Sequence, residues 1–274
     1  MPEQVRSIPS RLIAGSDLTL TGHQGLSASQ AVLLTGRPDL RQQILDAKPK
    51  LDPYTSFLVA VSMNDATKVR ACLRAHPEYA GTRLAIGSTA LHVAAVWNAC
   101  SAASALLSIG ADIEARDFHG ETPLQWCTHS HVGGAPNSAM AVFLLKHHAD
   151  PNTQDAAGNS PLLSAIAACN VPVAESLLAS GADPNIRNGN GETCLYVLVQ
   201  QGNQDLMTPL VSQLVSHGAD RYAVCWSEQY NQPSKSAMQT PLEAAVSRGY
   251  QQYAIALTNQ RSGLNGASQA GNAP

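Results

Sequence analysis

The chain has 274 residues, of which 44% are hydrophobic and 14% charged, so it can build a packed core, mainly from Ala, Leu and Val. Its formal net charge of −3 argues against a nucleic-acid partner, because phosphate backbones are bound by basic surfaces. No apolar run reaches the roughly 18 residues that favour a membrane span. The six scattered cysteines form no Cys-x-x-Cys pair, which indicates reduced thiols and a cytoplasmic location.

Residues 1–54 are predicted to form an N-terminal leader with short capping helices. Ser27, with Gln30 three residues later, has the pattern of a helix capping box. Residues 27–47 then carry apolar positions that suit one helix face, and we interpret them as one or two helices covering the array that follows. The alternative is a flexible recognition or export segment, although the start of the chain lacks the pattern of a secretory signal.

One pattern recurs through residues 55–260. A degenerate first copy is aligned at Thr55, and the clearest copy is TALHVAA from Thr89. Most copies are followed by a Leu-rich segment ending in Gly-Ala-Asp, and then by Asp/Asn-x-x-Gly before the next copy. Two of the steps between copies are 33 residues long. The later copies begin at Thr122, Ser160, Thr193 and Thr240.

The residues of the pattern have physical roles at the ends of helices. The Thr or Ser is expected to cap the first helix of each copy, and a Pro often follows where its missing N–H costs nothing. Gly110, Gly181 and Gly218 are expected to end the second helix in a left-handed conformation. His148 stands where a glycine is usual.

These residues and spacings resemble the ankyrin repeat. The resemblance implies an all-α fold, an ankyrin-repeat solenoid of about six helix-turn-helix units with short β-hairpin fingers. It also implies that His92, at the T-x-L-H position, makes a structural hydrogen bond between repeats. A solenoid of this kind is stabilised by stacking, because no single unit can bury its apolar side alone.

Two steps depart from the period. The step from Thr122 to Ser160 is longer because of an insertion between the two helices of that unit. The step after Thr193 is longer still, partly between the helices near residues 203–209 and mostly in the finger over residues 221–239. Insertions of this kind map to surface loops and often to the binding face. Residues 261–274 lack packing side chains and are expected to be a disordered tail.

Catalytic and metal signatures are missing from the sequence. Cys127, His129 and His131 alternate, but a zinc site needs about four convergent ligands, and Cys127 is expected to be buried between repeats. No phosphate loop, nucleophile elbow or zinc-protease motif is present. We therefore expect no enzyme activity, no cofactor and no bound metal.

The prediction of function rests on residues expected at the surface. The resemblance implies a partner on the concave side, made of finger tips and first-helix ends. Trp97 and Phe118 are expected to be neighbours and partly exposed, with packing of Trp97 over the repeat edge as the alternative. Aromatic anchors dominate many interfaces. The candidate partner-binding residues are Trp97, Phe118, His119, His129, Tyr222, Trp226 and Tyr230.

The sequence thus predicts a monomeric, cytoplasmic protein-interaction module that binds a protein partner, with no nucleic-acid or membrane partner. One alternative is a secreted or injected bacterial effector that engages a host protein, in which case the leader is an export signal. Another is an inhibitor or immunity-type partner protein. A leader packed on the first repeat favours the module or the inhibitor over the effector.

Overall fold

The computed structural model describes most of the repeat region and part of the leader. It forms two units, Met1–Ala182 and Asp183–Pro274. The expected disordered tail and the first 25 residues of the leader lie outside the described residues. The described ranges are 26–47, 51–129, 131–132, 135–136, 138–202, 204–225 and 239–258.

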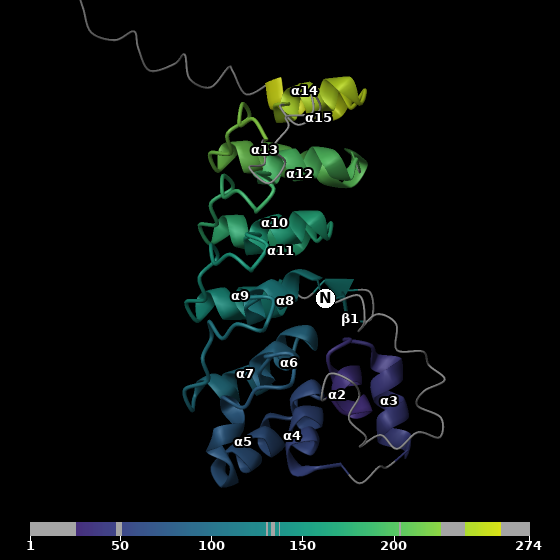
Figure 1. Ribbon diagram of the computed structural model, residues 1–274, viewed down its shortest axis with the longest axis vertical. Coiled ribbons are helices and arrows are strands. Elements are labelled where there is room, and N and C mark those ends of the chain that lie inside the picture. The colour runs from purple at the N-terminus through teal and green to yellow at the C-terminus, as the bar shows by residue number, and fades with distance from the viewer. Residues whose placement is uncertain are drawn as a thin grey trace, which may run out of the picture. The chain divides into compact units, whose positions relative to one another are not determined.

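Unit 1 contains four successive helix pairs (Figure 1). The first helices of neighbouring pairs pack on one another in one row, and the second helices pack in another. The 3-10 helix η2 (Pro77–Ala80) follows the first pair. The pairs are α4 (Pro53–Ser62) with α5 (Ala66–Ala75), α6 (Ala90–Val96) with α7 (Cys100–Leu107), α8 (Pro123–His129) with α9 (Ser138–Lys146), and α10 (Pro161–Ala167) with α11 (Val171–Ala179).

The predicted helix starts and stops are present. Ser160 caps α10, where its hydroxyl accepts a hydrogen bond from the Leu163 N–H at 3.3 Å, and Pro161 is the first helical residue. Thr89 is the N-cap of α6. Gly110 and Gly181 have φ values of 87° and 85°, in the left-handed region that a side chain disfavours. Local capping chemistry therefore sets the length of each helix.

The first repeat starts earlier than the sequence pattern indicates. Helix α4 begins at Pro53, and the Asp52 carboxylate accepts a hydrogen bond from the Thr55 N–H at 2.9 Å. Thr55, placed by its spacing at the start of the copy, is buried within the first turn. Asp followed by Pro is a stronger start signal than Thr followed by Ser, so it adds a turn to this helix.

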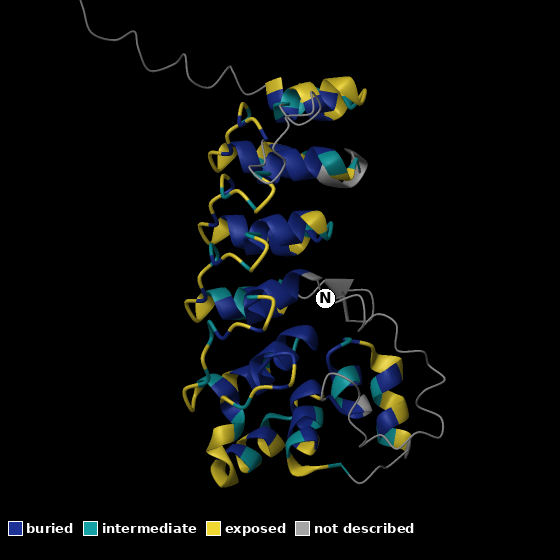
Figure 2. Ribbon diagram, in the orientation of Figure 1, coloured by how far each residue is buried: buried dark blue, intermediate teal, exposed yellow. Residues whose placement is uncertain are grey.

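Small apolar side chains make the core between repeats. Every residue of α6 is buried, because this helix lies between α4 and α8 and against α7. Figure 2 shows the first helices of unit 1 as largely buried, with exposed residues concentrated at the second helices and the turns. Burial of such surface is the main stabilising term in a stacked array.

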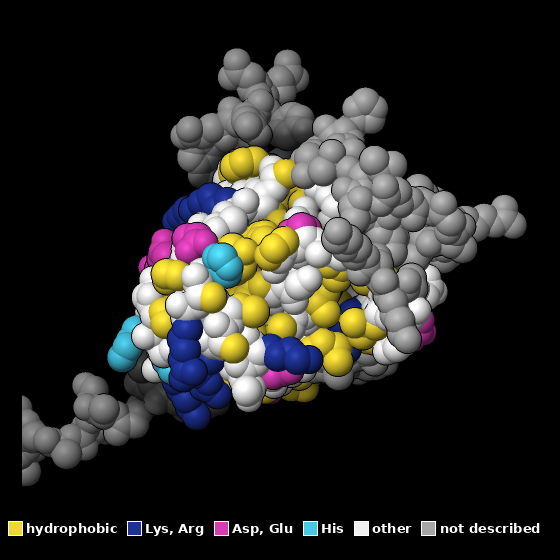
Figure 3. All heavy atoms as spheres, turned by 90° about the horizontal axis from the view of Figure 1, so that it is seen from below, with side chains coloured by type: hydrophobic (Ala, Val, Ile, Leu, Met, Phe, Trp, Pro, Cys, Tyr) yellow, Lys and Arg dark blue, Asp and Glu magenta, His cyan; other side chains and the backbone are white. Residues whose placement is uncertain are grey.

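The first pair, at one end of unit 1, carries a cluster of aromatic rings. Tyr54, Phe57 and Tyr79 lie with ring centroids 5.1–6.0 Å apart, and His76 stacks on Tyr79 at 4.7 Å. The Tyr54 hydroxyl donates to the Thr82 carbonyl at 2.9 Å. Figure 3 looks onto this end of the unit, where apolar side chains are visible among charged ones.

The leader contributes two helices to unit 1, α2 (Ala28–Leu33) and α3 (Pro38–Ala47). Helix α2 packs against α3 and against α4. In Figure 1 the two helices lie beside the first helices of the array, and not below the first pair. They therefore cover a side of the first repeats.

The insertion after α8 links the two helices of its repeat, as the spacing predicts. It contains two short antiparallel strands, β1 (His131–Val132) and β2 (Ala135–Pro136), paired His131↔Pro136 and Val132↔Ala135. The fingers themselves are tight turns. Each is closed by two backbone hydrogen bonds, such as those from the Asp117 N–H to the Glu121 carbonyl and from the Gly120 N–H to the Asp117 carbonyl, both at 3.0 Å.

Unit 2 contains the pairs α12 (Cys194–Gln201) with α13 (Gln204–Ser216), and α14 (Pro241–Ser247) with α15 (Gln251–Thr258). Helix α12 packs on α14, and α13 packs on α15. The expectation of an inter-helix insertion near residues 203–209 is wrong in part, because residues 204–209 belong to α13, with Pro209 inside the helix. The extra residues lengthen the helix instead of forming a loop.

Candidate partner-binding surface

Phe118 lies at the tip of a finger in unit 1 and is 74% exposed. Its N–H donates to the Ile86 carbonyl of the preceding finger at 3.0 Å. A Cβ on Gly87 would lie 2.6 Å from the Phe118 ring, so the ring rests on a backbone that lacks a side chain. The backbone of Phe118 is thus held in place while most of its ring faces solvent.

The turn that carries Phe118 is organised by Asp117. One carboxylate oxygen of Asp117 accepts from the N–H groups of His119 and Glu121 at 2.8 and 2.9 Å, and the other accepts from the Trp126 indole at 3.1 Å. Burial raises the pKa of Asp117, and these hydrogen bonds oppose that rise. The finger is therefore preorganised by a buried carboxylate that three donors satisfy.

His92 joins the α6 repeat to this finger, in agreement with the expected structural role. The Thr89 N–H donates to His92 Nδ1 at 3.0 Å, so Nε2 carries the proton and donates to the Glu121 carbonyl at 3.1 Å. Burial lowers the pKa of His92 to about 4. The imidazole is consequently neutral at physiological pH, and it meets the Trp126 ring edge-to-face at 5.1 Å.

Gln125 repeats this arrangement one unit later. Its Oε1 accepts from the Thr122 N–H at 3.0 Å, and its Nε2 donates to the Asn159 carbonyl at 2.9 Å. An amide thus replaces the imidazole with the same pairing of acceptor and donor. The sequence pattern alone did not identify Gln125 as the equivalent of His92.

A further link between fingers comes from arginines that sequence analysis missed. Arg83 donates to the Gly87 carbonyl in its own finger and to the Arg116 carbonyl in the next. Arg116 likewise donates to Gly120 in its own finger at 3.2 Å and to Gln154 in the following one at 2.7 Å. Their recurrence one repeat apart in the sequence is the signal that could have identified them. The fingers of unit 1 are therefore joined into one frame.

Trp97 is buried, which corrects the expectation that it is partly exposed. It is the C-cap residue of α6 and only 6% exposed. Its indole N–H donates to the Leu33 carbonyl at 2.6 Å, and the Arg41 guanidinium lies over its ring, 4.2 Å from the centroid. The leader helices cover this side chain. The alternative prediction, that Trp97 packs over the repeat edge, therefore agrees better with the structure than partial exposure does. The residues that cover it come from the leader and not from a repeat.

The remaining candidates differ in position. His119 is exposed beside Phe118 in unit 1. His129 ends α8, and its side chain is outside the described part of the structure. Tyr222 is 57% exposed in unit 2, whereas Trp226 and Tyr230 lie outside the described residues.

Cys127, Cys194 and Cys225 are buried, whereas Cys72, Cys100 and Cys169 are half-buried. Cys127 is fully buried, its thiol donates to the Pro123 carbonyl at 3.4 Å, and burial raises its pKa. Among the described residues, no group of three or more His, Cys, Asp or Glu side chains is placed to hold a metal ion. Over the same residues, no helix combines the length and apolar character needed to cross a membrane.

Comparison with known proteins identifies the family. The model of ankyrin repeats (three copies) matches residues 57–155 and 162–267. NF-kappa-B inhibitor alpha of Gallus gallus is 34% identical over 151 residues, covering 49% of this chain and 42% of that protein. Palmitoyltransferase ZDHHC13 of Homo sapiens is 38% identical over 89 residues, covering 32% of this chain and 14% of that protein. The chain thus spans less than half the length of these curated relatives.

A solved structure supports the same family. An ankyrin repeat domain from Acinetobacter baumannii AYE matches with a TM-score of 0.63 and 26% identity, covering 75% of this chain and 97% of that one. Ankyrin repeats are protein-interaction modules, and their fold is typically non-enzymatic. Because the family model matches most of the length of this chain, the chain belongs to the ankyrin-repeat family.

Proposed function

We propose that this chain is a protein-binding module whose main anchor is Phe118 at the finger tip of unit 1. The exposed ring is the single observation that carries the proposal, because aromatic side chains are enriched among the hot spots of protein interfaces. The hydrogen-bonded fingers support it, since a rigid frame loses little conformational entropy on binding. His119 is proposed to line the same contact.

Unit 2 offers its own exposed apolar groups. Tyr222 and Val224 lie in the described start of the long finger, and both are exposed. The Asp220 carboxylate accepts from the Tyr222 N–H at 2.8 Å, which holds the backbone at that point. We propose that this finger, with the candidates Trp226 and Tyr230, is a partner-binding element of unit 2. His129, at the end of α8, is a separate candidate in unit 1. Trp97 is buried under the leader helices, so we do not propose it as part of these contacts.

The test is affinity capture with paired variants. Wild type and Arg70→Ala, which changes an exposed position on α5, should capture the same protein from the source cells. Phe118→Ala should lose it, because trimming a hot-spot aromatic costs about 2 kcal/mol or more, roughly thirtyfold in affinity. Capture of one protein with equal affinity by Phe118→Ala and wild type would contradict the proposal.

The leader helices bear on the alternatives. Packing of α2 on α4 supports a module or inhibitor over an effector whose leader is an export signal. We propose that the chain acts as a cytoplasmic monomer, without catalysis. Limited proteolysis should cleave residues 26–47 much more slowly than an unstructured segment, and sedimentation should give the mass of one chain. Rapid cleavage within that segment would favour the export alternative.

A further inference from the structure

Residues 26–47 form a helical hairpin with its own small core. Val32 of α2 and Leu40 and Ile44 of α3 are buried in one cluster. Helix α2 starts with a capping box in which the Ser27 hydroxyl accepts from the Gln30 N–H, and the Gln30 carboxamide accepts from the Ser27 N–H. The hairpin thus carries the packing that holds its two helices together.

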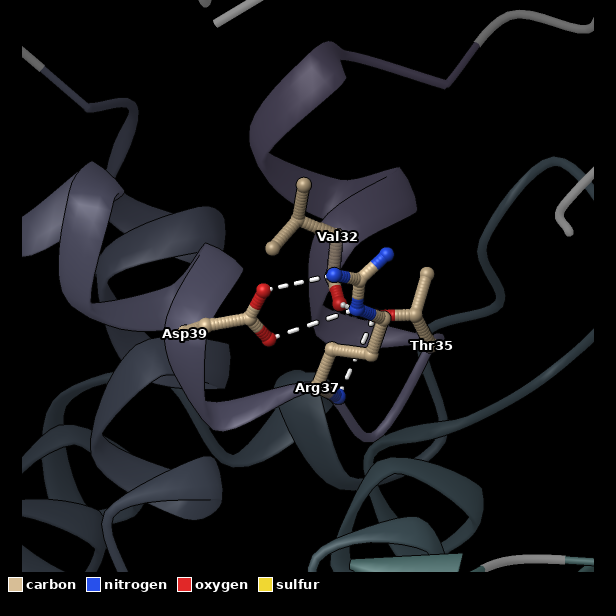
Figure 4. Close-up of polar contacts among 4 residues, drawn as sticks. All are labelled: Val32, Thr35, Arg37 and Asp39. Atoms are coloured by element: carbon tan, nitrogen blue, oxygen red, sulfur yellow. Dashed lines mark hydrogen bonds and ion pairs between the residues drawn. The ribbon is translucent and has the colours of Figure 1, made fainter. Parts of the chain in front are cut away.

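The turn between the two helices is fixed by polar contacts (Figure 4). The Thr35 hydroxyl donates to the Val32 carbonyl at 2.7 Å and accepts from the Arg37 N–H at 3.3 Å. The Arg37 guanidinium donates to both carboxylate oxygens of Asp39, at 3.3 and 2.6 Å. This bidentate pair lowers the pKa of Asp39, chiefly through the hydrogen bond from Arg37.

Specific groups on the repeats form hydrogen bonds and ring contacts with the hairpin. The Trp97 indole satisfies the Leu33 carbonyl, one of the carbonyls that the end of a short helix leaves without an intrahelical partner. Arg41 of α3 lies over the Trp97 ring and donates to the Ser62 carbonyl at the end of α4. At the other end of α2, the Gln30 amide donates to the Thr55 hydroxyl at 3.0 Å.

The same groups on the repeats would suit an incoming segment. Without the hairpin, Trp97 would present an aromatic face and an N–H donor, and Ser62 would present a backbone acceptor. An aromatic face attracts a cation, and an indole N–H needs an acceptor, so the surface selects a segment that offers both. Val32, Leu40 and Ile44 pack together within the hairpin, which favours departure of its two helices as one body.

We propose that the surface around Trp97 on α4 and α6 is a binding site for a helical hairpin, that residues 26–47 fill it reversibly, and that a partner segment with the same groups binds there by displacing them. The matching segment is an amphipathic helix pair with a free carbonyl at the end of its first helix and an arginine in its second. This goes beyond the proposed role of Phe118, because it concerns a different surface and is testable without any external partner.

The test uses the full chain and a fluorescein-labelled peptide of residues 26–47. Ile44→Asp places a charge in the core of the chain's own hairpin and should release it, whereas Ile44→Val is the matched control. Fluorescence anisotropy should show the peptide binding the Ile44→Asp chain at least tenfold more tightly than wild type or Ile44→Val. In those two chains the tethered hairpin competes at high effective concentration.

Two further variants locate the contact. An Arg41→Ala peptide should bind the Ile44→Asp chain at least tenfold more weakly than the wild-type peptide. Adding Trp97→Phe to that chain keeps a ring but removes the N–H donor, and should also weaken binding of the wild-type peptide. Equal peptide binding to the Ile44→Asp and wild-type chains, or binding to neither, would overturn the proposal. So would loss of the cooperative unfolding of the repeats in Ile44→Asp, because the hairpin would then be an integral part of the fold.

Discussion

Replacing His148 by glycine should make the protein more stable. His148 has φ 68° at the turn after α9, where Gly110 and Gly181 take the corresponding place with φ 87° and 85°. Its imidazole is exposed, so glycine opens no cavity. The hydrogen bond from its backbone N–H to the Leu145 carbonyl, at 3.0 Å, is independent of the side chain and should persist.

The size of the effect follows from two opposing terms. A left-handed conformation costs an L-residue roughly 1–2 kcal/mol. Glycine escapes that cost but loses about 0.5–1 kcal/mol more than other residues in backbone entropy on folding. The midpoints of these two ranges leave a rise of about 0.75 kcal/mol in the free energy of unfolding for His148→Gly, which corresponds to roughly 1.5–3 °C in Tm for a protein of this size.

The assay is urea and thermal unfolding followed by circular dichroism. His147→Gly is the matched control, because His147 is the neighbouring exposed histidine and does not have a left-handed backbone. It also loses the contact of its imidazole with the Phe143 carbonyl at 2.9 Å, so it should be less stable than wild type. If His148→Gly were no more stable than wild type, the argument from backbone strain would be refuted.

Three further predictions concern the repeats. Leu177→Ala removes a fully buried side chain and should cost about 2–5 kcal/mol in urea unfolding; an unchanged midpoint would contradict its core position. His92 has a folded pKa of about 4 against an ordinary 6.5, so the unfolded state takes up a proton that the folded state rejects. Stability should fall as the pH drops from about 6.5 to 4, by at most about 3 kcal/mol, and level off below. His92→Gln should keep the bridge, as Gln125 does, and remove that slope; an equal slope in both proteins would refute the assignment. Cys169→Gly relieves φ 54° but removes a half-buried thiol, so in the same assay it should raise stability by less than His148→Gly does; a gain as large as that of His148→Gly would contradict this reasoning.

The repeats were predictable because their signals are local. The Thr89 and Ser160 caps and the glycines that end the second helices act within a few residues, so a motif read along the chain locates them. The start of α4 was missed although its signal is present. The repeat spacing pointed to Thr55, whereas Asp52 and Pro53 carry the stronger start chemistry.

The state of Trp97 could not be predicted in the same way. Its hydrogen-bond acceptor, Leu33, lies 64 residues earlier in the chain, and nothing near either residue marks the pairing. A long separation in the sequence also hides the role of Arg41, because the residues around it show only an arginine on a short helix. Phe118 was predictable because a finger tip is exposed by its position in the repeat, irrespective of distant segments.

The claim that the leader helices fill the surface at Trp97 is tested most directly by hydrogen exchange of the Trp97 indole N–H. Its resonance in a protein with ¹⁵N-labelled tryptophan is assigned by its loss in Trp97→Phe. Because this proton is bonded to the Leu33 carbonyl and buried, it should exchange slowly in wild type and much faster in Ile44→Asp. The Trp126 indole, bonded to Asp117 within the repeats, should be unaffected. Exchange of the Trp97 proton in wild type at the rate of a solvent-exposed indole would contradict the account.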